Sequence, residues 1–173
     1  MSDNTYLLVL RLLHIGCGVM WAGTVIFLAF FVDPAIEASG PQGAKVMQQL
    51  LKTNRFPIVI MILAIVTVVA GVLLIWKVSD GLQSAWLASE NGKVLTGGAV
   101  MAIAAFIIGF IINRPAGARI AKIGKEIALT GTPPTESQLG EIKRLGRKLA
   151  IATKIMAFLL ILAIVGMSAF RYI

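Results

Sequence analysis

Long runs of apolar residues alternate with short polar segments along this chain. Four of these runs lie at about residues 6–32, 57–76, 94–112 and 149–170. A helix of ~20 apolar residues crosses the ~30 Å hydrocarbon core of a bilayer, and soluble domains rarely contain such runs. The pattern therefore predicts an all-α, polytopic membrane protein, in which residues 1–173 form a single transmembrane four-helix bundle.

The polar segments mark where the first two spans end and begin. Asp33-Pro34 is expected to end the first span, because proline removes a backbone donor from a helix. The following stretch AKVMQQLLKTN has apolar residues at helical spacing and predicts a short amphipathic helix on the membrane surface. Pro57 suits the first turn of the second span, where its missing N–H has no helical partner to lose.

The third span carries a face of small residues at spacings of four, three and four: Gly98, Ala102, Ala105 and Gly109. Small residues let helix backbones approach closely in lipid, so this face is expected to pack on another helix. The first span, with Gly16 and Gly23, is the candidate partner. This stripe favours a structural role rather than a ligand site.

Helical spacing continues past the third span. Ile120, Ile123 and Ile127 stay in register, the segment 130–134 predicts a turn, and Thr135 with Gln138 fits a capping box that starts the last helix. Helices three and four are therefore expected to extend from the membrane as a hairpin at about 113–148. Pro115 is the expected position of a kink in its first arm.

Charge sets the expected orientation. The chain is 58% hydrophobic and only 14% charged, yet it carries a net charge of +8. The first loop holds three basic residues and the hairpin eight, whereas the opposite side has only Lys77, Lys93 and Arg171. Because basic loops are retained in the cytoplasm, we expect the hairpin inside and both termini outside, in a bacterial inner membrane. The basic charge then indicates contact with the bilayer and its anionic lipid, and not with nucleic acid.

The candidate chemistry lies in the first span. Positions 11, 14, 18 and 21 share one helix face, which places Arg11, His14 and Trp21 in a line with Gly18 leaving space between the last two. His14 is the one histidine of the chain, and an ionisable residue inside a membrane usually faces the bundle interior. Two interpretations stay open: a structural histidine bonded to a neighbouring helix carbonyl, or a functional one acting as axial ligand, metal ligand or proton carrier.

The stretch RLLHIGCGVMWAGTVIFLAFFVDPAI resembles the first helix of the CopD-like small membrane proteins, a group that includes four-span bacterial proteins of unknown function. It is also similar to the first helix of HemJ-type protoporphyrinogen oxidases. The resemblance implies a haem b or porphyrin, or alternatively copper, bound in the bundle. His14 would then be the ligand, Arg11 would pair with a propionate or other anion, and Trp21 would form a pocket wall.

The chain departs from these families in ways that bear on the ligand set. The region where HemJ-type proteins carry a second histidine reads Val32-Asp33-Pro34-Ala35 here. A bound haem would therefore be five-coordinate, take a methionine, or be shared across a homodimer. Cys17 and Met20 could serve Cu(I), although methionine is also an ordinary core residue.

Motifs for catalysis are missing from the sequence: it contains no P-loop, no paired carboxylates within the spans and no metal-spaced cysteine cluster. No reaction is therefore assigned. The alternative interpretation is a non-catalytic accessory or scaffold subunit of a larger membrane complex.

Overall fold

The apolar runs fold into helices throughout the computed structural model, which describes residues 3–53, 55–170 and 172. The elements follow in the order α1 (Asp3–Phe27), η1 (Leu28–Val32), α2 (Asp33–Ala38), α3 (Gly40–Thr53), α4 (Phe56–Val78), α5 (Ser84–Ala88), α6 (Glu90–Ile108), η2 (Gly109–Asn113), α7 (Arg114–Thr130) and α8 (Glu136–Ala169). No strand occurs among these described residues, which confirms the all-α prediction.

Within the described chain, four helical stretches are long and apolar enough to cross a membrane: Asn4–Ala38, Phe56–Val78, Glu90–Thr130 and Glu136–Ala169. Their outward faces carry large apolar side chains, such as Val19 at 68% exposure and Ile111 at 64%. Contiguous apolar surface of this kind is rare on soluble monomers. The composition is that of a multi-pass membrane protein.

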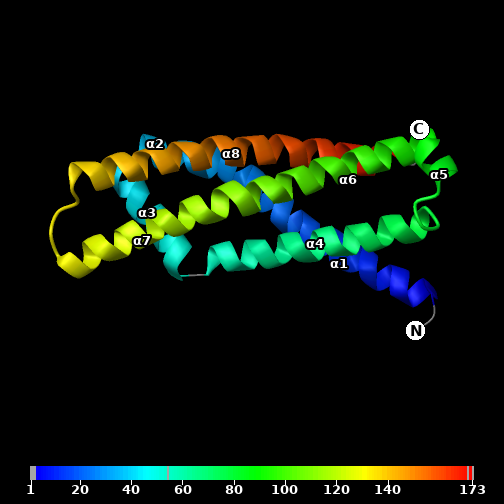
Figure 1. Ribbon diagram of the computed structural model, residues 1–173, viewed down its shortest axis with the longest axis horizontal. Coiled ribbons are helices and arrows are strands. Elements are labelled where there is room, and N and C mark those ends of the chain that lie inside the picture. The colour runs from blue at the N-terminus through cyan, green and yellow to red at the C-terminus, as the bar shows by residue number, and fades with distance from the viewer. Residues whose placement is uncertain (1–2, 54, 171, 173) are drawn as a thin grey trace.

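The long helices lie beside one another along one direction (Figure 1). α6 and α8 run side by side, the turn between α7 and α8 lies at one end, and both chain ends lie at the other. α1 runs obliquely to the rest: His14 contacts α4, whereas Phe30, in η1, packs edge-on against Phe158 of α8 with ring centroids 5.7 Å apart. The first span therefore contacts α4 through His14 and contacts α8 farther along, through Phe30.

The core where the helices meet consists mainly of small side chains. Its buried members are Trp21, Ala22, Val25, Ala29, Ala64, Ala105, Met156, Ala157 and Leu160. Alanine brings backbones close, and close packing drives helix association where the surrounding solvent is as apolar as the core. One large ring, Trp21 at 2% exposure, fills the remaining space.

The small-residue face of α6 packs on α8. A Cβ added at Gly98 would lie 3.2 Å from the carbonyl oxygen of Ala163, and one at Gly109 would lie 3.0 Å from Cε of Met156. The prediction of a packing face is confirmed, but the expected partner was wrong. A Cβ added at Gly16 or Gly23 of α1 would have no atom within 4 Å.

Both prolines that follow a span lie inside continuous helix. The first span does not end at Asp33-Pro34 as expected, since the helix continues to Ala38. A five-residue π-helical turn, Leu28–Val32, comes directly before Asp33, and a second one, Gly109–Asn113, comes directly before Arg114-Pro115. A π turn rearranges the hydrogen bonds that a proline would otherwise break, so the chain passes the proline without stopping.

The two arms that follow the third span form an antiparallel hairpin. The side chain of Thr135 accepts a hydrogen bond from the backbone of Gln138 and the Gln138 side chain returns one, so the predicted capping box is confirmed. Gly131 adopts a left-handed conformation that closes α7. Pro57 lies in the first turn of α4, as expected.

Candidate functional site

His14 joins α1 to α4 through a hydrogen bond to the main chain. Its Nδ1 lies 2.8 Å from the carbonyl oxygen of Thr67. A carbonyl oxygen can only accept, so Nδ1 must carry the proton and donate. In the neutral ring the lone pair then resides on Nε2, which is the tautomer that metal-binding histidines commonly adopt.

Two residues of α4 make room for this contact. A Cβ added at Gly71 would lie 2.7 Å from Cε1 of His14, so the ring occupies the space that a side chain would need. The Thr67 hydroxyl donates to the Leu63 carbonyl at 2.7 Å, and its methyl group lies 3.3 Å from where a Cβ of Gly18 would be. The space that Gly18 leaves beside His14 is therefore filled by Thr67.

The second ring nitrogen is the chemically open atom of the site. Among the described residues, Nε2 of His14 has no hydrogen-bond partner, and the side chain is partly exposed. The ring is thus neither sealed in the core nor fully satisfied. It can accept one hydrogen bond or donate one lone pair to a ligand.

The other two predicted site residues lie apart from this open nitrogen. Arg11, one turn before His14, is exposed. Trp21 is buried in the core together with Val25 and Ala64. The three residues share one side of α1, as the spacing predicts, yet the structure does not gather them around one cavity.

Candidate metal ligands near His14 are sparse. Cys17, three residues after His14, is partly exposed, and Met20 is exposed. Within the described part of the chain, no three His, Cys, Asp or Glu side chains group closely enough to hold a metal ion. His14 therefore fits as a single ligand, and Arg11 as an available surface cation. Trp21 does not fit as the wall of an open pocket.

Sequence reasoning missed Thr67 and Gly71, although a signal for both exists. Thr67 is the one polar side chain in the run from 58 to 75, and Gly71 is the one glycine there. A lone threonine followed one turn later by a glycine marks a place where another helix can bring in a polar ring. The sequence pattern does not show that His14 is the ring that contacts Thr67 and Gly71.

A second polar contact joins the third and fourth spans. Nδ2 of Asn113, the last residue of η2, lies 3.1 Å from Oγ1 of Thr153 and 3.5 Å from Sδ of Met156. Its Oδ1 is buried with no hydrogen-bond partner in the described part of the chain. The contact ties the π turn to α8.

The two arms of the hairpin are joined by an ion pair, and the first arm carries a buried isoleucine. Arg119 of α7 donates from Nε to Oε1 of Glu141 at 2.8 Å and from Nη2 to Oε2 at 3.0 Å. Glu141 lies outside the apolar run at 149–170. Hydrogen bonding to the Arg119 guanidinium lowers the pKa of the Glu141 carboxyl. Ile123, at 1% exposure, is buried on the same arm.

No family model, curated protein or solved structure matches this chain.

Proposed function

We propose that this chain is a four-span membrane protein in which Nε2 of His14 supplies one ligand to a small-molecule cofactor, a haem, a porphyrin or copper. The observation that carries the proposal is the hydrogen bond from Nδ1 to the Thr67 carbonyl. It orients the ring and leaves the lone pair on Nε2, as a hydrogen bond from the other ring nitrogen does in metal-binding histidines. Such a group would supply redox chemistry within the membrane.

The remaining ligands would come from outside this bundle. His14 is the one histidine of the chain, and Trp21 lies in the core, so a closed pocket within one copy lacks both a second imidazole and a wall. A second copy of the chain would bring a second His14 to the same site. Arg11, exposed one turn away, would then meet an anionic group of the cofactor.

The competing proposal is a non-catalytic accessory or scaffold subunit of a larger membrane complex. It is favoured by the core, where small side chains meet and Trp21 is buried. In this case the His14 hydrogen bond only joins α1 to α4. In both cases the charge distribution favours a bacterial inner membrane with the basic hairpin in the cytoplasm and both termini outside.

One pair of variants separates these proposals. The amide nitrogen of Asn lies near the position of Nδ1 in His, so His14→Asn keeps the donor to Thr67 and lacks Nε2. His14→Leu lacks both. The protein is purified in mild detergent, and its optical spectrum, metal content and unfolding are measured for all three forms.

The cofactor proposal expects a haem-type spectrum or stoichiometric copper in the unaltered protein. Both variants should lose it, and His14→Asn should be more stable to unfolding than His14→Leu, because it keeps the hydrogen bond to Thr67. A colourless, metal-free protein in which only His14→Leu is less stable overturns the cofactor proposal. That result supports the accessory role.

A further inference from the structure

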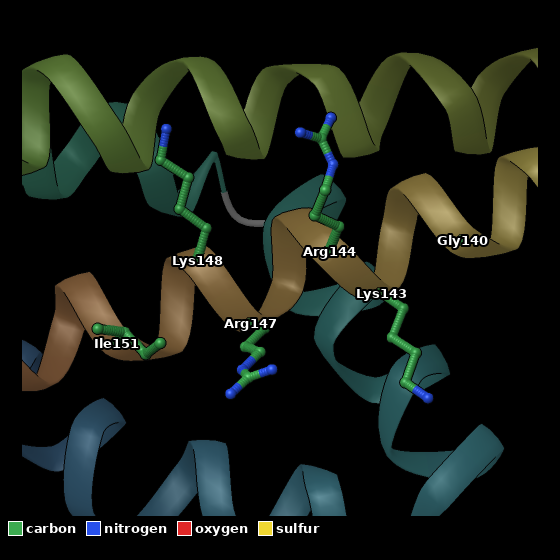
Figure 2. Close-up of a pocket in the computed structure, with 6 residues that line it drawn as sticks. All are labelled: Gly140, Lys143, Arg144, Arg147, Lys148 and Ile151. Carbon is green, nitrogen blue, oxygen red and sulfur yellow. The ribbon is translucent and has the colours of Figure 1, made fainter.

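The start of the fourth span carries four cations on two turns of α8. Lys143, Arg144, Arg147 and Lys148 are all exposed and, with Gly140 and Ile151, line an open hollow of about 520 Å³ (Figure 2). Arg144 and Lys148 extend toward the arm formed by α6 and α7, whereas Lys143 and Arg147 extend to the other side of α8.

These cations lie close enough along α8 to repel one another. Lys143 and Arg147 are four residues apart, as are Arg144 and Lys148, and like charges at this spacing destabilise a helix. None of the four takes part in an ion pair within the described ranges, where Glu141 is already paired with Arg119. Glu141 does lie close enough to Arg144 to interact with it electrostatically. An added anion would relieve the repulsion.

A second hollow, with mainly apolar lining residues, adjoins the first. It has a volume of about 170 Å³ and is lined by Ile108, Ile112, Lys148, Ile151, Ala152 and Ile155. Lys148 and Ile151 belong to both hollows, so the cationic end passes directly into the apolar one. From Lys148 to Ile155 the groove follows α8 for ~10 Å toward the middle of the span.

A cationic hollow beside an apolar one is complementary to an anionic phospholipid, which has a charged headgroup and apolar acyl chains. We propose that the groove binds one such lipid, with its phosphate between Arg144 and Lys148 and an acyl chain along the isoleucines of α6, η2 and α8. A soluble phosphate or an acidic peptide would use only the cationic half. The lysine at the junction stands at the end of the apolar span, which is where lipid headgroups lie.

Lipid binding at this site is more specific than a general attraction between basic loops and a charged membrane, because it depends on the named residues that line the two hollows. It is independent of the role of His14. The His14→Asn variant is expected to bind the lipid as the unaltered protein does.

The test is native mass spectrometry of the full chain released from detergent, with three probes: phosphatidylglycerol, phosphatidylcholine of the same acyl chains, and glycerol phosphate. We expect one retained phosphatidylglycerol and roughly tenfold weaker binding of the other two. Arg144→Gln with Lys148→Gln should weaken phosphatidylglycerol binding roughly tenfold or more. Ile151→Asn should weaken it while leaving the charge unchanged.

The matched control is Lys122→Gln with Lys125→Gln, which removes the same charge from exposed positions on α7, outside the groove. This variant should bind phosphatidylglycerol like the unaltered protein. The proposal is overturned if both double variants weaken binding equally, since the effect would then be general charge. It is also overturned if glycerol phosphate binds as tightly as the lipid, or if phosphatidylcholine does.

Discussion

In the α1–α4 pair the helices meet through an imidazole, whereas in the α6–α8 pair they meet through backbone. The ring of His14 fills the space over Gly71 and bonds to the Thr67 carbonyl. Between α6 and α8, a Cβ on Gly166 would lie 3.4 Å from the Val94 carbonyl oxygen, and Gly98 approaches α8 as closely. In the α1–α4 pair, Gly71 leaves room for the side chain of His14. In the α6–α8 pair, Gly98 and Gly166 let the two backbones come into contact.

The two pairs nevertheless share a plan. The first helix of each contains a five-residue π turn, followed at once by a charged residue, a proline and an alanine: Asp33-Pro34-Ala35 in one and Arg114-Pro115-Ala116 in the other. Since both pairs have this π turn and proline, they differ mainly in the residues through which their helices make contact. A backbone contact tolerates no added atom, while a side-chain contact can be removed and replaced.

The largest effect is expected at the backbone contact. Gly98→Leu would place a Cβ 3.2 Å from the Ala163 carbonyl oxygen and 3.2 Å from Cγ of Met167, with further atoms beyond it. Because a backbone carbonyl cannot move aside, α6 and α8 should separate, with a loss of about 3 kcal/mol in unfolding free energy. The measurement is unfolding in mixed micelles followed by circular dichroism.

Gly97→Leu is the matched control for this substitution. It makes the same change one residue earlier on α6, where a Cβ has no atom within 4 Å. Its unfolding should stay close to that of the unaltered protein. Equal losses in both variants would show that glycine at 98 is not needed for contact with α8.

A smaller effect is expected at the side-chain contact. Gly71→Ala would place a Cβ 2.7 Å from Cε1 of His14, so the ring must leave its position and lose the bond to Thr67. Hydrogen bonds between membrane helices contribute about 0.6–1.7 kcal/mol, so a loss of about 1 kcal/mol is expected. The same micelle unfolding experiment measures it.

A double-mutant cycle distinguishes this steric effect from a general effect of alanine in α4. In a His14→Ala background the ring is gone, and Gly71→Ala should then be neutral or slightly stabilising. Gly16→Ala, on the open side of α1, should be near neutral in both backgrounds. Additive losses at 14 and 71 would mean that the ring does not occupy the space over Gly71.

The sequence predicted features that depend on one segment at a time. The four apolar runs, the capping box at Thr135 and the first-turn Pro57 are local patterns, and each appears in the structure as expected. The packing face of α6 was also predictable, because helical periodicity places Gly98 and Ala105 on one side. Periodicity cannot say which helix lies against that side, and this partner was predicted wrongly.

Features that depend on two segments could not be predicted in the same way. One local prediction, the end of the first span at Pro34, was wrong because a π turn compensates for the proline. The contacts of His14 needed Thr67, 53 residues away, to be brought beside it. The groove on α8 likewise combines cations and isoleucines of α8 with isoleucines of α6 and η2.

The smallest effect is expected where the hairpin arms meet at the surface. The hydrogen bond from Arg119, followed by charge attraction from Arg119 and Arg144, holds the pKa of the Glu141 carboxyl below its ordinary value. A carboxylate with a lowered folded-state pKa stabilises the fold above its unfolded pKa of about 4.3, and this contribution is lost as pH falls through the lower folded value. Carboxyl-carbon NMR of Glu141 across acidic pH measures this pKa.

Arg119→Gln should raise the pKa of Glu141 toward its ordinary value, whereas Lys122→Gln, on the same arm, should leave it unchanged. A pKa that does not respond to Arg119→Gln would mean that the bidentate pair does not persist in solution.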